Sequence, residues 1–331
     1  MTRVRGAALL TAAMTVVFAA GCSSSGNSTG SPGPIEKPDL NVAVVPALDS
    51  AGFFVALNEH LFAQQGLNVN FIPAISSDTV IAAQVNGKYD ITGGNYVSYI
   101  QWQQSGRANL DIFAEASVME PATQGVYVMP NSPVKTLADL KGKTIAINAP
   151  NNILYLLVAS VLAEHGISPA TVHFVTKYSF PQMPAALAAG KIDAAVLPEP
   201  FASVAEQANG AVPLVDLDQG ATMSFPIAGY VVTKAWAKKY PHTLAAFYRA
   251  LEQGQEIADT NRIAVEQAFE ALQAPLGVSK GTAAVMALDD YPVSTGPVGS
   301  VDLVQLQRVV DVMQQFLMIP KFSINSMVLT G

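Results

Sequence analysis

Cysteine and histidine are scarce in this chain of 331 residues, which has one cysteine and four histidines. A disulfide framework needs paired cysteines, and a zinc site needs cysteine or histidine at close spacing, so both are excluded. Charged residues make up only 13 %, about half the ~25 % of an average soluble domain. The net charge is −7 and no basic run follows Arg5, which argues against binding nucleic acid through its phosphates. We therefore expect no metal, no other cofactor and no nucleic acid.

Motifs of nucleotide-binding proteins are missing as well. The chain contains no G-x-G-x-x-G turn. Gly142-Lys143-Thr144 has the ending of a phosphate loop, but Leu137 stands where the first glycine would be needed, and the lysine begins a predicted strand. The sequence therefore predicts no nucleotide-binding site, and we also expect that the protein is not an enzyme.

Apolar residues, in contrast, are plentiful. Hydrophobic residues make up 50 % of the chain, whereas a disordered chain would be poor in them. The length exceeds what one small core can organise and fits two domains of ordinary size.

The N-terminus has the pattern of a secretory signal. Arg3 and Arg5 precede an apolar stretch of about 14 residues, shorter than the ~20 needed to span a bilayer and typical of a signal peptide. Ala19-Ala20-Gly21 then leads into Cys22, as in a lipobox, although Leu or Val is commoner than Ala at position 19. We predict that residues 1–21 are a signal peptide and that Cys22 is lipidated. The alternative is ordinary cleavage beside an incidental cysteine.

The stretch after Cys22 predicts a tether. Ser23 to Pro34 reads SSSGNSTGSPGP and offers no apolar side chain to bury. We assign residues 22–38 to a flexible linker that joins the lipid anchor to a folded body. The expected location is the extracytoplasmic face of the cell membrane.

An internal repeat predicts the fold class. Apolar strands and helices alternate twice, and each half contains a helix followed by Gly-Lys-x-Asp and a strand, at residues 87–90 and 190–193. Glycine ends the helix in a left-handed conformation, and the apolar positions that follow start a buried strand. We predict an α/β protein made of two βαβαβ units with mostly parallel sheets. Further helices are expected at residues 235–260, 263–273, 280–287 and 301–318.

Candidate ligand contacts follow from this topology, because ligands bind outside the carboxyl ends of strands in such sheets. Some candidates have a structural alternative: the asparagines can cap a helix, Asp49 can do the same, and Glu199 can form a hinge hydrogen bond. The candidate residues are Asp49, Ser50, Ser76, Ser77, Gly94, Asn95, Tyr96, Glu115, Asn148, Asn151, Asn152, Tyr178, Phe180, Glu199 and Phe201.

Two segments resemble a known family. KTLADLKGKTIAI at residues 135–147 and ALAAGKIDAAVLPEPF at residues 186–201, together with the order of elements and the lipobox, resemble the solute-binding proteins of ABC importers. Within that group they resemble the sulfonate, nitrate, taurine and thiamine-precursor-pyrimidine branch. The resemblance implies a monomer that delivers a small-molecule ligand to the transmembrane subunits of an ABC permease.

The resemblance also implies a two-lobe, type II periplasmic-binding-protein fold with the ligand in the cleft between the lobes. Lobe I would comprise residues 39–127 and 229–331, and lobe II residues 128–228. The two crossovers would lie near residues 126–131 and 225–233.

The charge of the expected cleft loops bears on the ligand. They contain five carboxylates, one lysine (Lys177) and no arginine; the carboxylates belong to Asp49, Asp78, Glu115, Glu120 and Glu199. We expect a small nitrogen- or sulfur-containing organic solute, preferably neutral or cationic with a heteroaromatic ring. Asp49 or Glu199 would accept from its amine, and Tyr96, Tyr178 or Phe180 would cover the ring.

Other interpretations stay open. Helix N-termini near residues 50–52 and 151–152 can bind an anion without a basic side chain, so an alkanesulfonate, taurine or nitrate receptor is the first alternative. A fold-related enzyme and a sensor or adaptor lipoprotein are alternatives of another class.

Overall fold

The computed structural model describes residues 33–272, 301–317 and 319–329. The predicted signal peptide, Cys22, most of the predicted tether and the helix expected at residues 280–287 lie outside them. Across these three ranges, every helix is too short or too polar to serve as a transmembrane span.

The first of two sheets has five strands in the order β2-β1-β3-β10-β4. β1 is parallel to β2 and β3, whereas β10 is antiparallel to both β3 and β4. The strand bounds are β1 Asp39–Val44, β2 Asn68–Pro73, β3 Ile91–Asn95, β4 Leu110–Val118 and β10 Pro226–Thr233.

The second sheet repeats this order as β7-β6-β8-β5-β9. β6 is parallel to β7 and β8, and β5 is antiparallel to β8 and β9. The bounds are β5 Gln124–Val128, β6 Thr144–Ala146, β7 His173–Val175, β8 Ala194–Pro198 and β9 Val212–Asp216. The predicted α/β class and its internal repeat are confirmed, and both sheets are mixed.

The repeated Gly-Lys-x-Asp motif has the same role in both halves. Gly87 and Gly190 are left-handed, with φ of 76° and 64°, and each ends a helix. The aspartate of each motif then accepts a hydrogen bond from the backbone of the neighbouring parallel strand. Asn41 N donates to Asp90 Oδ2 at 2.9 Å, and Thr144 N donates to Asp193 Oδ2 at 2.8 Å. Each motif therefore stops a helix and sets the register of the strand after it.

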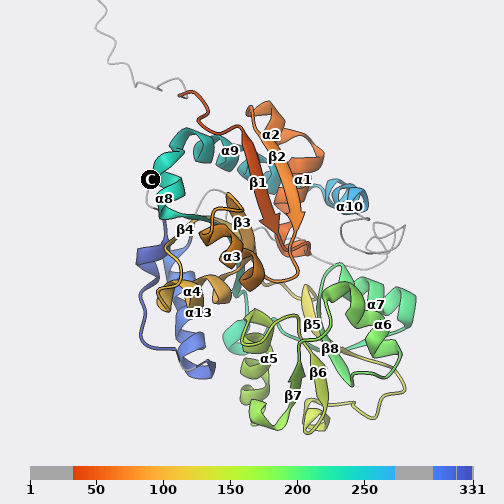
Figure 1. The fold of residues 1–331 in the computed structure, drawn as a ribbon. Helices are drawn as coiled ribbons and strands as arrows, with labels where there is room; N and C mark the ends of the chain where they lie inside the picture. The colour runs from red at the N-terminus through yellow and green to blue at the C-terminus, as the bar shows by residue number, and fades with distance from the viewer. Residues whose placement is uncertain (1–32, 273–300, 318, 330–331) are drawn as a thin grey trace, which may run out of the picture. The chain divides into compact units, whose positions relative to one another are not determined.

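Helices flank both sheets (Figure 1). Around the first sheet lie α1 Ala51–Asn58, α2 Leu61–Gln64, α3 Ser77–Val85, α4 Tyr96–Gln104, α8 Lys234–Lys239, α9 Pro241–Thr260, α10 Arg262–Ala271 and α13 Leu303–Phe316. Around the second lie α5 Ile153–Glu164, α6 Met183–Ala188 and α7 Phe201–Asn209.

The core beside the first sheet is rich in aromatic rings where α1 meets α9. Phe53 of α1 stacks on Phe247 of α9, with ring centroids 6.4 Å apart. The two helices approach so closely that a Cβ added at Gly254 would collide with the carbonyl oxygen of Gly52 and the side chain of Ala56. Glycine is therefore required sterically at this crossing.

The chain passes between the sheets earlier than the sequence predicted. β4 ends at Val118 and β5 begins at Gln124, so the first passage lies at residues 119–123. The second lies at residues 217–225, between β9 and β10. Residues 126–128 and 226–233, which we expected at crossovers, are instead strand residues within the sheets. Their apolar runs indicate a buried strand but not the sheet to which it belongs.

Candidate functional site

A buried pocket lies where loops from the two sheets meet. It is lined at the carboxyl ends of β1, β3, β6 and β8, the location that the α/β topology predicts for a ligand. Its volume is about 30 Å³, room for roughly one or two water molecules. The lining residues are Val45, Asp49, Ser50, Ser77, Gly94, Asn95, Gln124, Asn148, Ile153, Leu154, Phe180, Pro198 and Ala228.

Asp49 is the carboxylate of this pocket and lies in a short 3-10 helix, Leu48–Ser50, directly after β1. Its Oδ1 accepts hydrogen bonds of 3.2 Å from Ser117 Oγ and from Gln124 Nε2. Burial raises the pKa of Asp49 to about 6, and the two hydrogen bonds oppose that shift. Because Gln124 begins β5, the second bond connects the two sheets.

The first-sheet wall depends on Ser77 and Asn95. Ser77 Oγ accepts hydrogen bonds from Asn95 N at 3.0 Å and from Asn95 Nδ2 at 2.9 Å. Asn95 Oδ1 in turn accepts from Ser98 N and so caps α4. A Cβ at Gly94 would collide with the Ser77 side chain, so the close approach of α3 to β3 requires glycine here. The sequence predicted that Gly94, Asn95 and Tyr96 lie in a cleft loop, but β3 continues to Asn95 and α4 starts at Tyr96.

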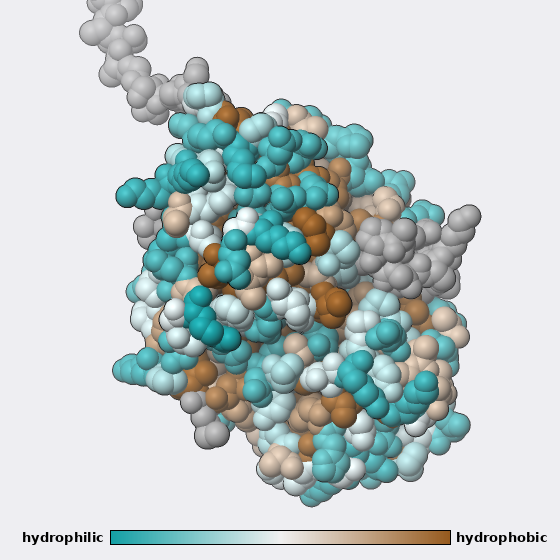
Figure 2. All heavy atoms as spheres, viewed as in Figure 1, coloured by the Kyte–Doolittle hydropathy of each residue, from teal (hydrophilic) through white to brown (hydrophobic). Residues whose placement is uncertain are grey.

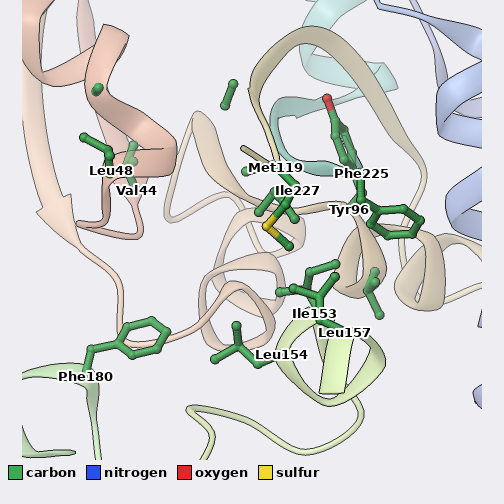
Figure 3. Close-up of a cluster of buried hydrophobic side chains, with 14 of the residues drawn as sticks. Val44, Leu48, Tyr96, Met119, Ile153, Leu154, Leu157, Phe180, Phe225 and Ile227 are labelled. Carbon is green, nitrogen blue, oxygen red and sulfur yellow. The ribbon is translucent and has the colours of Figure 1, made fainter. Parts of the chain in front are cut away.

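The second-sheet wall combines a polar and an apolar part. Asn152 caps α5 by accepting from Tyr155 N at 3.3 Å, and its Nδ2 donates to Asn148 Oδ1. Asn148 lines the pocket, whereas Asn152 lies outside the lining and contacts Asn148 through this hydrogen bond. Phe180 lies among the buried apolar side chains shown in Figure 3, together with Ile153 and Leu154.

Two further hydrogen bonds join the sheets around the pocket. Leu48 N donates to Glu199 O at 2.8 Å. Gln101 Nε2, from α4, donates to Asn151 O at 2.9 Å, just before α5. The backbone of Asn151 is left-handed, with φ of 50°. The first-sheet and second-sheet walls are therefore held together on more than one side.

The structure places the predicted contacts in two groups. Seven candidates line the pocket: Asp49, Ser50, Ser77, Gly94, Asn95, Asn148 and Phe180. Eight lie outside its lining: Ser76, Tyr96, Glu115, Asn151, Asn152, Tyr178, Glu199 and Phe201.

Several residues outside the lining have structural partners. Glu199 Oε2 accepts from Ser203 N and Oγ at 3.2 and 2.7 Å, at the start of α7. Phe201 stacks on Phe180, with centroids 5.4 Å apart, and so supports the ring that does line the pocket. Tyr178 lies beside the ammonium group of Lys177, whose Nζ is 5.1 Å from the ring centroid.

Tyr96 begins α4 and Glu115 lies in β4, so neither lies in the cleft loops in which the sequence predicted them. Tyr96 is fully buried against Gly229, the register partner of Glu115 in β10. Glu115 lies within β4 because this strand continues to Val118. Asp78 accepts from Ser98 Oγ and Trp102 Nε1, at 2.9 and 3.0 Å. Of the five carboxylates in the charge argument, Asp49 is therefore the one found among the described lining residues.

Six lining residues were not predicted: Val45, Gln124, Ile153, Leu154, Pro198 and Ala228. Ile153 and Leu154 directly follow the Asn148–Asn152 loop that was predicted, so the first turn of α5 could have been included. Gln124 has no local signal, because it begins a strand of the second sheet and reaches Asp49 only through the tertiary fold.

A comparison with protein families bears on this arrangement. A family model described as "NMT1/THI5 like" matches residues 47–262, about two thirds of the chain. The chain belongs to the NMT1/THI5-like family. The matched region of this family member contains all of the described pocket lining except Val45.

Two curated relatives show lower similarity. The nitrate import ATP-binding protein NrtC of Synechocystis is 27 % identical over 246 residues, which cover 69 % of this chain and 36 % of that protein. A protein of Brachyspira hyodysenteriae, named as an ABC transporter periplasmic binding protein, is 28 % identical over 201 residues. That match covers 56 % of this chain and 55 % of the relative. The chain therefore matches about a third of the first relative and about half of the second.

Solved structures share the fold at low sequence identity. The alkanesulfonate-binding protein SsuA of Xanthomonas axonopodis pv. citri, bound to MOPS, has a TM-score of 0.72 at 18 % identity, over 89 % of this chain and 99 % of that one. The periplasmic nitrate-binding protein NrtA of Synechocystis also scores 0.72, at 14 % identity, over 89 % and 85 %. The desulfurization enzyme DSZB scores 0.61 at 16 % identity, over 86 % and 94 %. The two-lobe periplasmic-binding-protein fold is confirmed, and it is a fold on which both binding proteins and an enzyme occur.

Proposed function

We propose that the protein is the extracytoplasmic solute-binding component of an ABC importer, which captures a small nitrogen- or sulfur-containing organic solute and passes it to a permease without catalysis. One observation carries this proposal. Polar side chains from both sheets converge on a single buried pocket at the carboxyl ends of parallel strands, as a receptor that encloses its ligand requires. The names of two relatives, a nitrate import ATP-binding protein and an ABC transporter periplasmic binding protein, support it.

Uptake of a solute requires the pocket to open. A volume of about 30 Å³ admits roughly one or two water molecules, so this conformation is closed to any organic solute. We propose that the lobes rotate about the passages at residues 119–123 and 217–225. Opening would break the hydrogen bonds that Gln101, Leu48 and Asp49 form across the sheets. Closing around a solute would restore them.

The charge of the lining favours a neutral or cationic solute. Asp49 supplies a carboxylate, and none of the described lining residues is lysine or arginine. Phe180 supplies an aromatic face, which suits a heteroaromatic ring. The N-termini of α3, α4 and α5 also face the pocket and attract acceptor atoms, so a sulfonate, taurine or nitrate receptor is the second candidate.

Anchoring by lipid is part of the proposal. Cys22 would carry the lipid and residues 22–38 would hold the body away from the membrane surface. We also propose a monomer, and the described face drawn in Figure 2 is largely hydrophilic, with apolar side chains in small separate groups, as expected of a face exposed to solvent.

A thermal-shift screen of the mature protein against a metabolite library tests the proposal. A solute at 100 times its dissociation constant adds ~2.7 kcal/mol of stability, an easily measured shift. The shift in melting temperature should disappear in Asp49→Asn. It should persist in the control Glu59→Gln, which alters an exposed carboxylate at the C-terminal end of α1. A screen without hits would favour a sensor or adaptor. Chemical turnover of a hit on incubation would show an enzyme.

A further inference from the structure

Gln124 has a buried polar atom that the rest of the described structure does not satisfy. Its side chain is 1 % exposed and lines the pocket. Its amide nitrogen donates to Asp49, but its carbonyl oxygen Oε1 has no hydrogen-bond partner among the described residues. Buried carbonyls are nearly always hydrogen-bonded in folded proteins. An unpaired one has lost its hydrogen bonds to water without gaining a replacement, which costs free energy.

The orientation of this amide follows from its neighbour. Asp49 is the partner of Nε2, and an ionised carboxylate can only accept hydrogen bonds. Rotating the amide by half a turn would bring Oε1 against the carboxylate oxygen and replace an attraction with a repulsion. Ser117 Oγ donates to the same oxygen of Asp49 and adds no donor for Gln124. Because Gln124 lines the pocket, the contents of the pocket are the remaining source of a donor for Oε1.

We infer that Gln124 determines specificity in this pocket: the solute must present an N–H or O–H group to Gln124 Oε1, beside the Asp49 carboxylate. Solutes whose polar atoms are all acceptors, such as nitrate and simple alkanesulfonates, would leave this oxygen unpaired and are rejected. The inference rests on the proposed function and adds to it the atom, Gln124 Oε1, that recognises a donor group of the solute. It separates this chain from the nitrate- and alkanesulfonate-binding proteins that share its fold.

Matched pairs of solutes test the inference by calorimetry. Each pair keeps the heavy-atom shape and replaces a donor group by methyl: taurine against propane-1-sulfonate, and 4-amino-2-methylpyrimidine against 2,4-dimethylpyrimidine. A different hit from the screen is paired with its own methyl analogue in the same way. The donor-bearing member of the pair that binds should bind about 10- to 100-fold more tightly.

Two variants assign that preference to one residue. Gln124→Met keeps the length of the side chain and removes the carbonyl, so the ratio of the two dissociation constants should fall several-fold, and the part of the preference that comes from Asp49 should remain. Gln101→Met is the matched control, since it removes a hydrogen bond between the sheets away from the lining. It should weaken both members of a pair and leave their ratio unchanged. If Gln124→Met does not fold, the ratio in the wild-type protein remains decisive.

The outcomes separate this inference from the proposed function. Equal binding of both members of a pair by the wild-type protein would overturn the inference while the receptor function stands; a water molecule trapped beside Oε1 would produce that result. Tight binding of nitrate would overturn it as well. A library screen with no hit at all would remove the proposed function, and this inference with it.

Discussion

Glu115 should make the stability of this protein fall as the pH rises through neutrality. Its side chain is 4 % exposed, and its Oε2 has no hydrogen-bond partner among the described residues. Burial, and next the negative charge of Asp302, raise the pKa of Glu115 from its ordinary 4.5 to about 7. Both causes penalise the ionised form in the folded protein. The perturbation that tests this is Glu115→Gln, which keeps the shape and cannot ionise.

The direction of the pH dependence follows from the raised pKa. Between pH 4.5 and pH 7 the unfolded chain loses the Glu115 proton while the folded protein keeps it. The stabilisation that this proton gives is complete below pH 4.5 and is lost as the pH rises through 7. A difference of about 2.5 pKa units corresponds to about 3 kcal/mol at most. Relative to the wild type, Glu115→Gln should therefore gain about 2–3 kcal/mol between pH 5 and pH 8.

Urea unfolding of the wild type and of Glu115→Gln at several pH values measures this gain. Comparing the two proteins cancels the titration of groups that they share, which includes Asp49. The exposed Glu59→Gln serves as the control and should follow the wild type at every pH. If the curve of Glu115→Gln runs parallel to that of the wild type from pH 5 to pH 8, Glu115 does not ionise in this range and the reasoning is refuted.

Three further predictions concern other parts of the chain. Gly254→Ala should lower the free energy of unfolding by about 1–3 kcal/mol, because the new Cβ collides with Gly52 of α1; an unchanged melting temperature would contradict the close crossing. Burial raises the pKa of Asp49 to about 6, so calorimetry should show a cationic solute binding more weakly at pH 5 than at pH 7.5. Affinity that rises on acidification would contradict that role. Cys22→Ser should move the protein from the membrane fraction to the soluble fraction, and a variant that stays membrane-bound would exclude the lipid anchor.

The sequence predicted the repeat well because its signals are local. Gly-Lys-x-Asp occurs twice, and the structure gives both copies the same turn and the same aspartate hydrogen bond. Right-handed crossovers are expected for the parallel strands of both sheets, but the repeat did not predict the strand order or the antiparallel strands β10 and β5. The passages between sheets were placed several residues too late, because an apolar run such as residues 124–128 does not indicate which sheet it joins.

The site was predicted only in part, because it depends on contacts between distant segments. Asp49 and Asn148, which the sequence placed in loops at strand ends, line the pocket. The charge argument counted Asp78 and Glu199 as free carboxylates, although Ser98 and Ser203 already donate to them. No local pattern marks Gln124, whose importance comes from lying against a residue 75 positions earlier in the chain.

A crystal structure of the protein with the solute found by the screen tests the central claim most directly. The account predicts the solute enclosed between the two sheets, in contact with Asp49, Ser77 and Phe180, with a donor group of the solute on Gln124 Oε1. A solute bound elsewhere on the molecule, with this pocket still closed and holding only water, would contradict the account.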